Sequence, residues 1–418
     1  MNSKQKSVRS WGQLDMKYKW RAYHLGEITE LVIDYRGKTP KKLGGDWSES
    51  GYRALSAKNI KTGHIVQPDT IRFVSEEMYH KWMKDEIQRG DIIITSEAPF
   101  GQILYWDSEE KIVLSQRLFG VRVKKEHDSK FVYYYMTTSD FQGEMDGRAT
   151  GTTVVGLRQS ELMKCVVRCP NLDTQKKIAS ILSSIDEKIL INDKINENLE
   201  QQAQALFKSW FLNYEPWEGM VPNSWLHGNL GDYANIKRGG SPRPIQEYLS
   251  DSGLRWLKIS DVTSLQTPFI IDIKDHIIEE GLKKTVFLKA GSLVLSNSAT
   301  PGIPKILDVD SCIHDGWLYF PESKFSNEYL YLYFKYIRQQ LVNLSNGSVF
   351  NNLKTDILKG YPTILPDEET LQRFDGIIKP MFLQMQNLTR ESHNLMDLRD
   401  TILPRLMSGE LDVSGIDI

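Results

Sequence analysis

The chain contains an internal duplication, which restricts it to folds built from two copies of one unit. Residues 149–178 (ATGTTVVGLRQSELMKCVVRCPNLDTQKKI) align without a gap to residues 345–374 (SNGSVFNNLKTDILKGYPTILPDEETLQRF), at an offset of 196. Upstream, RGDIIITSEAPFG at 89–101 resembles AGSLVLSNSATPG at 290–302. An internal repeat is the sequence signature of a repeated structural unit. We therefore expect two similar globular domains.

Each copy is followed by a segment with the apolar spacing of a long paired helix, because alternating steps of four and three residues recover a repeat of 3.5. The predicted helix-pairing seam consists of Ile178, Leu182, Ile185, Ile189, Leu199 and Leu206 in the first helix and of Phe374, Ile378, Met381, Met385, Leu388, Leu395 and Ile402 in the second. Asn192 and Asn196 also fall on the seam, either as ordinary imperfections or as polar contacts that fix the register.

The predicted fold class is α+β, because short β-branched runs such as IIIT and LVLS alternate with Gly and Pro turns before each long helix. We expect two similar globular domains separated by two long antiparallel coiled-coil helices, with pseudo-twofold symmetry. The predicted boundaries are 1–170 for the first domain, 171–215 for the first helix, 216–366 for the second domain and 367–418 for the second helix. Pro380 and Pro404 predict a kink or an early stop in the second helix, and Gly409 is placed to end it.

Composition and missing motifs exclude several classes of protein. No stretch of about 18 apolar residues could span a bilayer, so we expect a soluble cytoplasmic protein. Cys165, Cys169 and Cys312 have neither zinc-ligand spacing nor a disulfide pattern, and we expect them to be buried. The sequence contains no G-x-x-x-x-G-K-[ST], G-x-G-x-x-G or H-E-x-x-H motif. We therefore predict a non-catalytic chain that holds no cofactor or metal of its own.

Two similar but non-identical domains at a fixed separation suit an extended ligand such as duplex DNA. RGKTP at 36–40 resembles RGGSP at 238–242, and basic residues surround both glycine turns. Such side chains could contact phosphates, or grip guanine through arginine. The DNA-binding candidates are Arg36, Lys38, Lys41, Lys42, Lys58, Asn59, Arg148, Thr150, Arg158, Lys237, Arg238, Arg243, Asn346, Ser348 and Lys354. Solvated basic turns are the alternative for these loops. The tyrosines at 133–135, and at 329, 331 and 333, favour a core role over base stacking.

Three motifs give the chain a family resemblance: PNLDTQKKIASILSSIDEKI from 170, QALFKSWFLNYEP from 204 and TILPRLMSGEL from 401. In this order and inside a duplication, they resemble the central and distal regions of the specificity subunit of type I restriction-modification systems. The second copy departs from the pattern, because Leu371 stands where the first has Gln175.

The resemblance implies that each recognition domain reads one half of a bipartite DNA site, while the helices set the spacer and dock two methyltransferase subunits. Restriction motor-nuclease subunits join the complex. S-adenosylmethionine, ATP and Mg are then expected on the partner subunits. Two alternatives are a nuclease, which would need a repeated acidic cluster with a lysine, and a scaffold that bridges two proteins without reading DNA.

Overall fold

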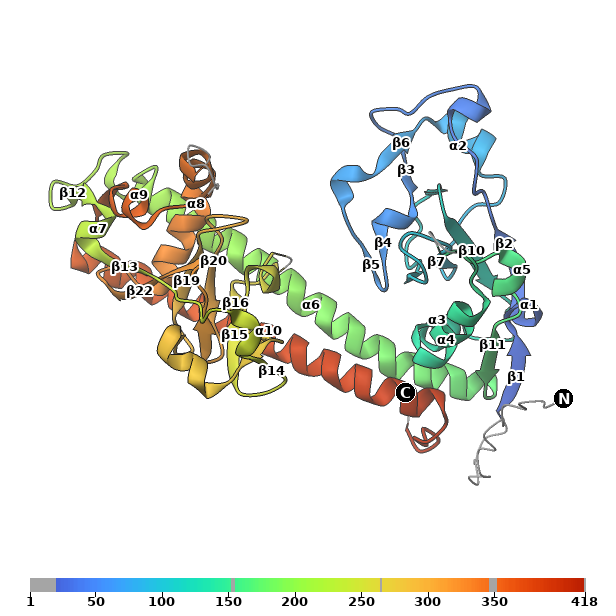
Figure 1. Ribbon diagram of the computed structural model, residues 1–418. Coiled ribbons are helices and arrows are strands. Elements are labelled where there is room, and N and C mark those ends of the chain that lie inside the picture. The colour runs from blue at the N-terminus through green and yellow to red at the C-terminus, as the bar shows by residue number, and fades with distance from the viewer. Residues whose placement is uncertain (1–19, 152–154, 264, 346–351, 417–418) are drawn as a thin grey trace. The chain divides into compact units, whose positions relative to one another are not determined.

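The computed structural model describes residues 20–151, 155–263, 265–345 and 352–416. It divides into two compact units, the first formed by Met1–Glu187 with Met396–Ile418 and the second by Lys188–Leu395. Helices α6 (Leu172–Phe211) and α10 (Glu368–Met407) each contribute residues to both units (Figure 1). The predicted α+β fold of two similar domains is confirmed. In the described ranges, no helix is long and apolar enough to cross a membrane.

The first unit is built on a four-stranded sheet of order β2-β10-β7-β8, with a second sheet β6-β3-β9 and the pairs β1-β11 and β4-β5. Its strands are β1 (Arg21–His24), β2 (Thr29–Ile33), β3 (Tyr52–Leu55), β4 (Ile60–Lys61), β5 (His64–Ile65), β6 (Arg72–Val74), β7 (Ile92–Thr95), β8 (Ile103–Tyr105), β9 (Val113–Leu114), β10 (Leu118–Val123) and β11 (Val166–Cys169). Its shorter helices are α1 (Leu25–Ile28), α2 (Glu76–Trp82), α3 (Ser129–Thr137), α4 (Ser139–Arg148) and α5 (Gln159–Leu162).

The second unit repeats this topology, because β13-β22-β19-β20 has the order of β2-β10-β7-β8 and gains β16 at its edge. A second sheet has the order β14-β17-β15-β21-β18, and β12 pairs with β23 as β1 pairs with β11. The strands are β12 (Leu226–Asn229), β13 (Ala234–Arg238), β14 (Leu249–Ser250), β15 (Leu254–Leu257), β16 (Phe269–Ile270), β17 (His276–Ile277), β18 (Val286–Leu288), β19 (Leu293–Ser296), β20 (Pro304–Leu307), β21 (Ser311–Ile313), β22 (Trp317–Ser323) and β23 (Pro362–Leu365). The helices are α7 (Leu230–Tyr233), α8 (Asn327–Ser345) and α9 (Thr355–Lys359).

Strand β7 is apolar without alternation because both of its faces are buried. Ile92 and Ile94 belong to the core that includes residues of α3, whereas Ile93 belongs to the core under the β6-β3-β9 sheet. Successive side chains of a strand point to opposite faces, so a sheet covered on both sides needs apolar residues at every position. The six tyrosines predicted to be core residues, at 133–135 in α3 and at 329, 331 and 333 in α8, are 2–9% exposed, which confirms that they belong to the cores. The three cysteines are also buried, as predicted.

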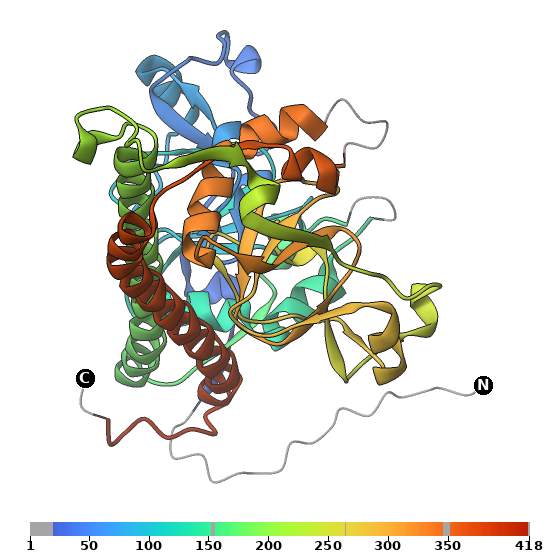
Figure 2. The same cartoon turned by 90° about the vertical axis from the view of Figure 1, so that its left-hand side faces the viewer.

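Within the second unit, α6 and α10 run antiparallel and side by side (Figure 2). The most buried positions of this part of α6 are Asn192, Asn196, Glu200, Ala203, Phe207 and Phe211, and those of α10 are Thr370, Phe374, Ile378, Phe382, Met385, Thr389 and Ser392. Phe374, Ile378 and Met385 lie on this stripe as the seam predicted, but the stripe departs from the seam elsewhere, because a straight helix has 3.6 residues per turn and drifts from a 3.5-residue repeat. Ile189, Leu199, Leu206, Met381, Leu388 and Leu395 lie beside the stripe and are half-buried.

Within the first unit, the seam residues Ile178, Leu182 and Ile185 are buried, and Ile402 is half-buried. In the second unit, Asn192 Nδ2 donates to Glu391 Oε2 at 2.8 Å, and Asn196 Nδ2 donates to Thr389 Oγ1 at 3.3 Å. These bonds cross from α6 to α10. They favour the interpretation of the two asparagines as contacts that fix the register.

A buried tyrosine anchors each domain to a long helix. In the first unit, the Tyr134 hydroxyl donates to Asp186 Oδ2 at 2.6 Å, and Arg399 Nη1 donates to Asp186 Oδ1 at 2.9 Å. In the second, the Tyr331 hydroxyl donates to Glu200 Oε1 at 2.5 Å, and Lys335 pairs with the same oxygen. Each carboxylate therefore has a cation beside it, as a partly buried charge requires.

Both long helices begin at an Asx cap, 196 residues apart. Asn171 Oδ1 accepts from the Thr174 N–H, and Asp367 Oδ1 accepts from the Thr370 N–H, each at 2.9 Å. A kink or an early stop was predicted at Pro380 and Pro404, and the early stop is wrong, since α10 continues to Met407. The packing of α10 against the second unit's core on both sides of Pro380 offsets the missing backbone bond. The chain turns at Gly409, whose φ of 79° suits glycine.

The segment after α10 completes the core of the first unit. Val413 is 1% exposed and belongs to the cluster that contains Leu25 and Leu182. Lys177 Nζ donates to the carbonyl oxygens of Ser414 at 3.1 Å and Ile416 at 2.8 Å. A Cβ at position 409 would lie 2.6 Å from Trp20 Nε1, so the turn after α10 packs tightly on the first described residue.

Lys305 is the one predominantly buried lysine among the described residues, with 4% of its surface exposed. Its Nζ donates to the Leu265 carbonyl oxygen at 2.9 Å and to that of Thr267. Burial lowers the pKa of Lys305 to about 8, although Glu200 opposes the shift. The folded second unit therefore holds this proton less tightly than the unfolded chain does.

We predict that the free energy of unfolding rises between pH 8 and pH 10 because of Lys305. The unfolded chain keeps this proton up to about pH 10.5, whereas the folded chain releases it near pH 8, so folding is favoured by up to about 3 kcal/mol more across that window. Urea unfolding of the wild type and of Lys305→Met at several pH values measures the difference. Parallel pH profiles for the two proteins would contradict it.

Candidate nucleic-acid interface

The loops that the duplication superposes meet through the same backbone hydrogen bonds in both units. In the first unit, the Ser96 N–H donates to the Arg117 carbonyl oxygen at 2.8 Å, and the Leu157 N–H donates to the Ser96 carbonyl oxygen at 3.0 Å. In the second, Asn297 takes the place of Ser96, and the corresponding bonds, from Asn297 to Gly316 and from Leu353 to Asn297, are both 2.8 Å. We call this arrangement the loop junction of each unit.

The segments that follow Ser96 and Asn297 also have similar backbone conformations in the two units. Ala98 and Ala299 occupy corresponding positions, and both have positive φ, of 35° and 58°. Such backbone is unfavourable for residues other than glycine and persists where surrounding contacts determine it. A turn closes behind each alanine, with Gly101 N–H donating to Thr95 O and Gly302 N–H donating to Ser296 O. Each unit thus presents a rigid loop at the same edge of its sheet.

The side chains of two first-unit candidates, Arg36 and Lys38, bind groups of the protein itself. Arg36 donates through Nε and Nη2 to the Asp34 carboxylate at 2.9 and 2.8 Å, and its guanidinium lies 4.0 Å from the Phe119 ring centroid. Lys38 Nζ donates to the Trp82 carbonyl oxygen at 2.8 Å, and burial lowers the pKa of Lys38. Both contacts would have to break before these side chains could reach a ligand.

Of the other first-unit candidates, some have side chains that are buried or paired within the protein, and the rest are exposed. Asn59 is 1% exposed, because its side chain accepts from the Ser56 N–H and donates to Thr70 Oγ1, so the surface role expected for it is wrong. Arg148 pairs with Glu144 at 3.0 Å. The exposed candidates are Lys41, Lys42, Lys58, Thr150 and Arg158.

Arg117 and Glu97 are the residues at the first loop junction that sequence reasoning missed. Arg117 Nε lies 3.7 Å from Glu97 Oε1, and the side chains are 46% and 37% exposed. The alignment of SEAPFG with NSATPG placed Glu97 in a repeated loop, but Arg117 follows a short strand in a part of the chain that the repeat matches too weakly to notice.

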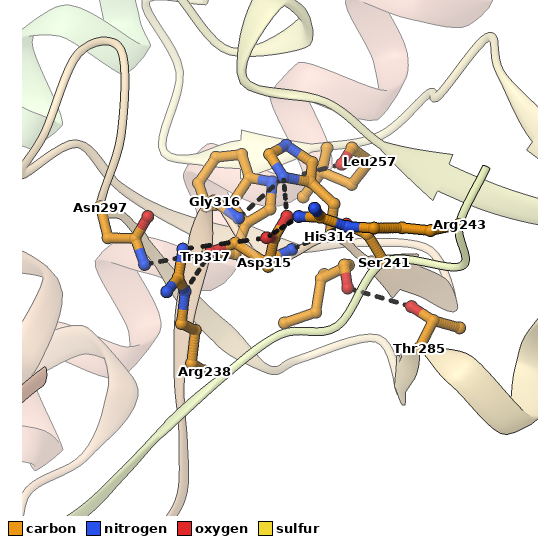
Figure 3. Close-up of polar contacts among 11 residues, drawn as sticks. Arg238, Ser241, Arg243, Leu257, Thr285, Asn297, His314, Asp315, Gly316 and Trp317 are labelled. Carbon is orange, nitrogen blue, oxygen red and sulfur yellow. Dashed lines mark hydrogen bonds and ion pairs between the residues drawn. The ribbon is translucent and has the colours of Figure 1, made fainter. Parts of the chain in front are cut away.

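In the second unit, the corresponding loops are built around Asp315 (Figure 3). The Ser241 hydroxyl donates to Asp315 Oδ1 at 2.7 Å. Arg243 Nη2 donates to Asp315 Oδ2 at 3.1 Å, and Arg238 Nη2 lies 3.9 Å from the same oxygen. The Arg238 and Arg243 side chains are 50% and 79% exposed. Two guanidinium groups therefore converge on one carboxylate at the surface.

The glycines of RGGSP serve close backbone packing, not the approach to phosphate that the basic loop suggested. A Cβ on Gly239 would lie 2.2 Å from the His314 carbonyl oxygen, and one on Gly240 would lie 3.0 Å from the Lys284 carbonyl oxygen. The Gly239 N–H donates to Trp317 O at 2.9 Å. The loop is thus fixed on the turn 314–316 by its main chain, which leaves the arginine side chains outside.

The surroundings of Asp315 and His314 determine the protonation states of both side chains at neutral pH. Burial disfavours the ionised Asp315 carboxyl, but the Ser241 hydroxyl and the charges of Arg238 and Arg243 outweigh it and hold its pKa below the ordinary value. Burial lowers the pKa of His314, and its Nδ1 accepts from the Gly316 N–H at 2.8 Å. We infer an ionised Asp315 beside a neutral His314.

The remaining second-unit candidates are less informative. Lys237 and Lys354 are exposed, and Asn346 and Ser348 lie outside the described residues. Asp315 and Asn297 were not among the candidates, although Asn297 stands in the repeated loop and its Nδ2 donates to the Asp315 carbonyl oxygen at 3.3 Å. No cluster of three or more His, Cys, Asp or Glu in the described part of the chain could hold a metal ion.

We predict that Gly239→Ala destabilises the second unit, because the added methyl group overlaps the His314 carbonyl oxygen and the turn must shift. Overpacking of this kind costs about 1–3 kcal/mol. Denaturant unfolding measures the loss. Gly376→Ala is the matched control, since nothing lies within 4 Å of its added Cβ and alanine favours the helix. Equal stability of Gly239→Ala and the wild type would show that the loop adapts.

Comparison with known proteins places the chain in a family. The model of the type I restriction modification DNA specificity domain matches residues 17–201 and 222–387. The MjaIX specificity subunit of Methanocaldococcus jannaschii is 24% identical over 349 residues, which cover 78% of this chain and 79% of that protein. The HindI specificity subunit of Haemophilus influenzae is 23% identical, covering 78% and 88%.

A solved structure agrees with the fold. The type I restriction-modification S subunit from M. genitalium gives a TM-score of 0.62 at 16% identity, and the match covers 94% of this chain and 97% of that one. At this identity the likeness concerns the fold. The family match extends over both units and more than half of the chain, so this protein belongs to the family of type I restriction-modification DNA specificity subunits.

Proposed function

We propose that the chain is the DNA-reading subunit of a type I restriction-modification complex, in which each unit reads one half of a bipartite site. The recurrence of the loop junction carries this proposal. The same backbone bonds recur in both units, while the residues beside them differ: Glu97 and Arg117 in the first, Ser298 and Gly316 in the second. A shared frame with different side chains is suited to two different half-sites.

The chemistry at the loop junctions supports DNA as the ligand. Arginine is the side chain that most often reads a base edge in the major groove, through paired donors to guanine O6 and N7. Exposed arginines lie at or beside both junctions: Arg117 belongs to the first, and in the second unit Arg243 pairs with Asp315, the neighbour of Gly316. Exposed cations such as Arg158 and Lys354, at corresponding positions, suit contacts with phosphates.

The long helices are proposed to set the spacer between the half-sites and to dock two methyltransferase subunits. Leu190 and Ile191 of α6 are 53% and 51% exposed, and Leu383 of α10 is 57% exposed. Large apolar side chains left in solvent on otherwise paired helices are suited to a protein partner. S-adenosylmethionine, ATP and Mg are assigned to the methyltransferase and motor-nuclease partners, and this chain is proposed to be non-catalytic.

The competing proposal is a scaffold that bridges two proteins without reading DNA. The exposed apolar residues of α6 and α10 suit a scaffold equally well, so they do not decide between the two. The loop junctions favour DNA reading, because a scaffold would not require exposed arginines in a rigid, repeated frame at the edge of both units.

The decisive experiment is single-molecule methylation mapping of a strain that expresses this chain with its methyltransferase subunit. We expect a bipartite adenine-methylated motif that disappears when the chain is deleted. Exchange of residues 217–366 for the corresponding domain of a relative should change one half of the motif only. An unchanged methylome, with a methyltransferase shown to be active beside another specificity subunit, would support the scaffold.

Docking of the partner is tested by Leu383→Asp. A charge in place of a buried interface leucine should cost several kcal/mol and lower the yield of the methyltransferase subunit in co-purification at least tenfold. Leu226→Asp is the control, because Leu226 is 55% exposed but lies on β12, away from α6 and α10 in sequence. If the yield of the methyltransferase subunit falls equally in both variants, or falls in neither, docking at this part of α10 is contradicted.

A further inference from the structure

We propose that Arg243, held by Asp315, reads a guanine in the half-site recognised by the second unit. This inference rests on the proposed function and names the residues and the base. Two arginines, Arg238 and Arg243, lie beside the single Asp315 carboxylate at the surface. The cluster therefore carries a net positive charge of one.

The two arginines are held differently. Arg238 donates through Nε to the Asp315 carbonyl oxygen and is half exposed, so it belongs to the frame of the turn. Arg243 is 79% exposed, and Asp315 Oδ2 engages its Nη2 end at 3.1 Å. A guanidinium carries five N–H donors in a planar fork, so one bond to a carboxylate leaves donors for a base edge.

Asp315 is itself fixed, which makes it suited to orient Arg243. Its Oδ1 accepts from the Ser241 hydroxyl at 2.7 Å, and its own backbone N–H donates back to the Ser241 oxygen at 3.3 Å. Its carbonyl oxygen accepts from Asn297 Nδ2, a residue of the loop junction. The carboxylate is therefore positioned by the same frame that is repeated in the first unit.

Stability does not explain the Arg243–Asp315 pair. Exposed ion pairs contribute little, because solvent screens the charges and the long side chain loses conformational freedom. The loop is already held by the backbone bonds of Gly239 and Gly240 to Trp317 and Ile313. The pair favours one orientation of a side chain that would otherwise sample many rotamers, which lowers the cost of ordering Arg243 on a base edge.

The first unit lacks this pair at the corresponding positions. Matching RGKTPKK with RGGSPRP places Lys41 where the second unit has Arg243, and matching the turns 115–117 and 314–316 places Gln116 where it has Asp315. A lysine offers a point charge and no planar fork. The two units therefore differ at the residues to which base reading is assigned, so the guanine read by the Arg243–Asp315 pair belongs to the second half-site.

Methylation mapping of the full complex in cells tests the inference, with Arg243→Lys and Asp315→Asn compared with the wild type. The wild-type half-site assigned to residues 217–366 should contain a fixed G·C pair. Arg243→Lys should relax that position by about tenfold or more, measured as methylation of sites that carry another base there. Asp315→Asn should relax the same position, because the guanidinium loses its fixed orientation.

The other half of the motif is an internal control, since its unchanged sequence shows that the variant folds and assembles. If Arg243→Lys lowers methylation at all sites without altering the motif, Arg243 contacts phosphate and the inference is overturned. If only Asp315→Asn relaxes the position, the carboxylate reads cytosine itself, and the role of Arg243 is overturned. A motif that does not depend on the chain at all would reject the proposed function first.

Discussion

The main-chain hydrogen bonds at Ser96 and Asn297 are the constraint on which the two recognition units depend. Each residue uses its N–H and its carbonyl oxygen to join two loops that are distant in sequence, and neither bond involves a side chain. Because the main chain holds the loops together, the side chains beside the junction can change without loss of the frame. A duplicated unit can therefore diverge in what it recognises while its fold stays constant.

The duplication made most of the architecture predictable. The apolar runs at Ile92 and Leu293 indicated buried strands, and both are central in equivalent sheets. The helix-pairing stripe was predictable in kind but only partly in register, because in α6 the neighbouring Phe207 is more deeply buried than the predicted Leu206. A period estimated from sequence cannot separate 3.5 from 3.6 residues per turn over a few turns, and tertiary contacts decide between neighbouring apolar positions.

The recognition surface was harder to predict, because composition identifies charges but not their partners. Arg36 and Arg238 are equivalent in sequence, yet Arg36 is occupied by Asp34 and Phe119, whereas Arg238 lies at the exposed turn around Asp315. The sequence around Asp315, HDG, contains no recognisable motif. Asp315 is singled out only because Arg238 and Arg243, which are distant in sequence, lie beside it in the fold. The glycines beside Arg238 suggested an approach to phosphate, but the group that lies against Gly239 is the His314 carbonyl oxygen.

The burial of Val413 in the core of the first unit has a consequence for synthesis. The residues that close this core, from Met396 to Ile416, leave the ribosome after the whole of the second unit, although the rest of the first unit leaves before it. The second unit can therefore form before the first is complete, whereas the first keeps an apolar surface open until residues 396–416 have been made. The domain made first is the last to finish folding, and in the interval its unfilled core is a site for chaperones or for aggregation.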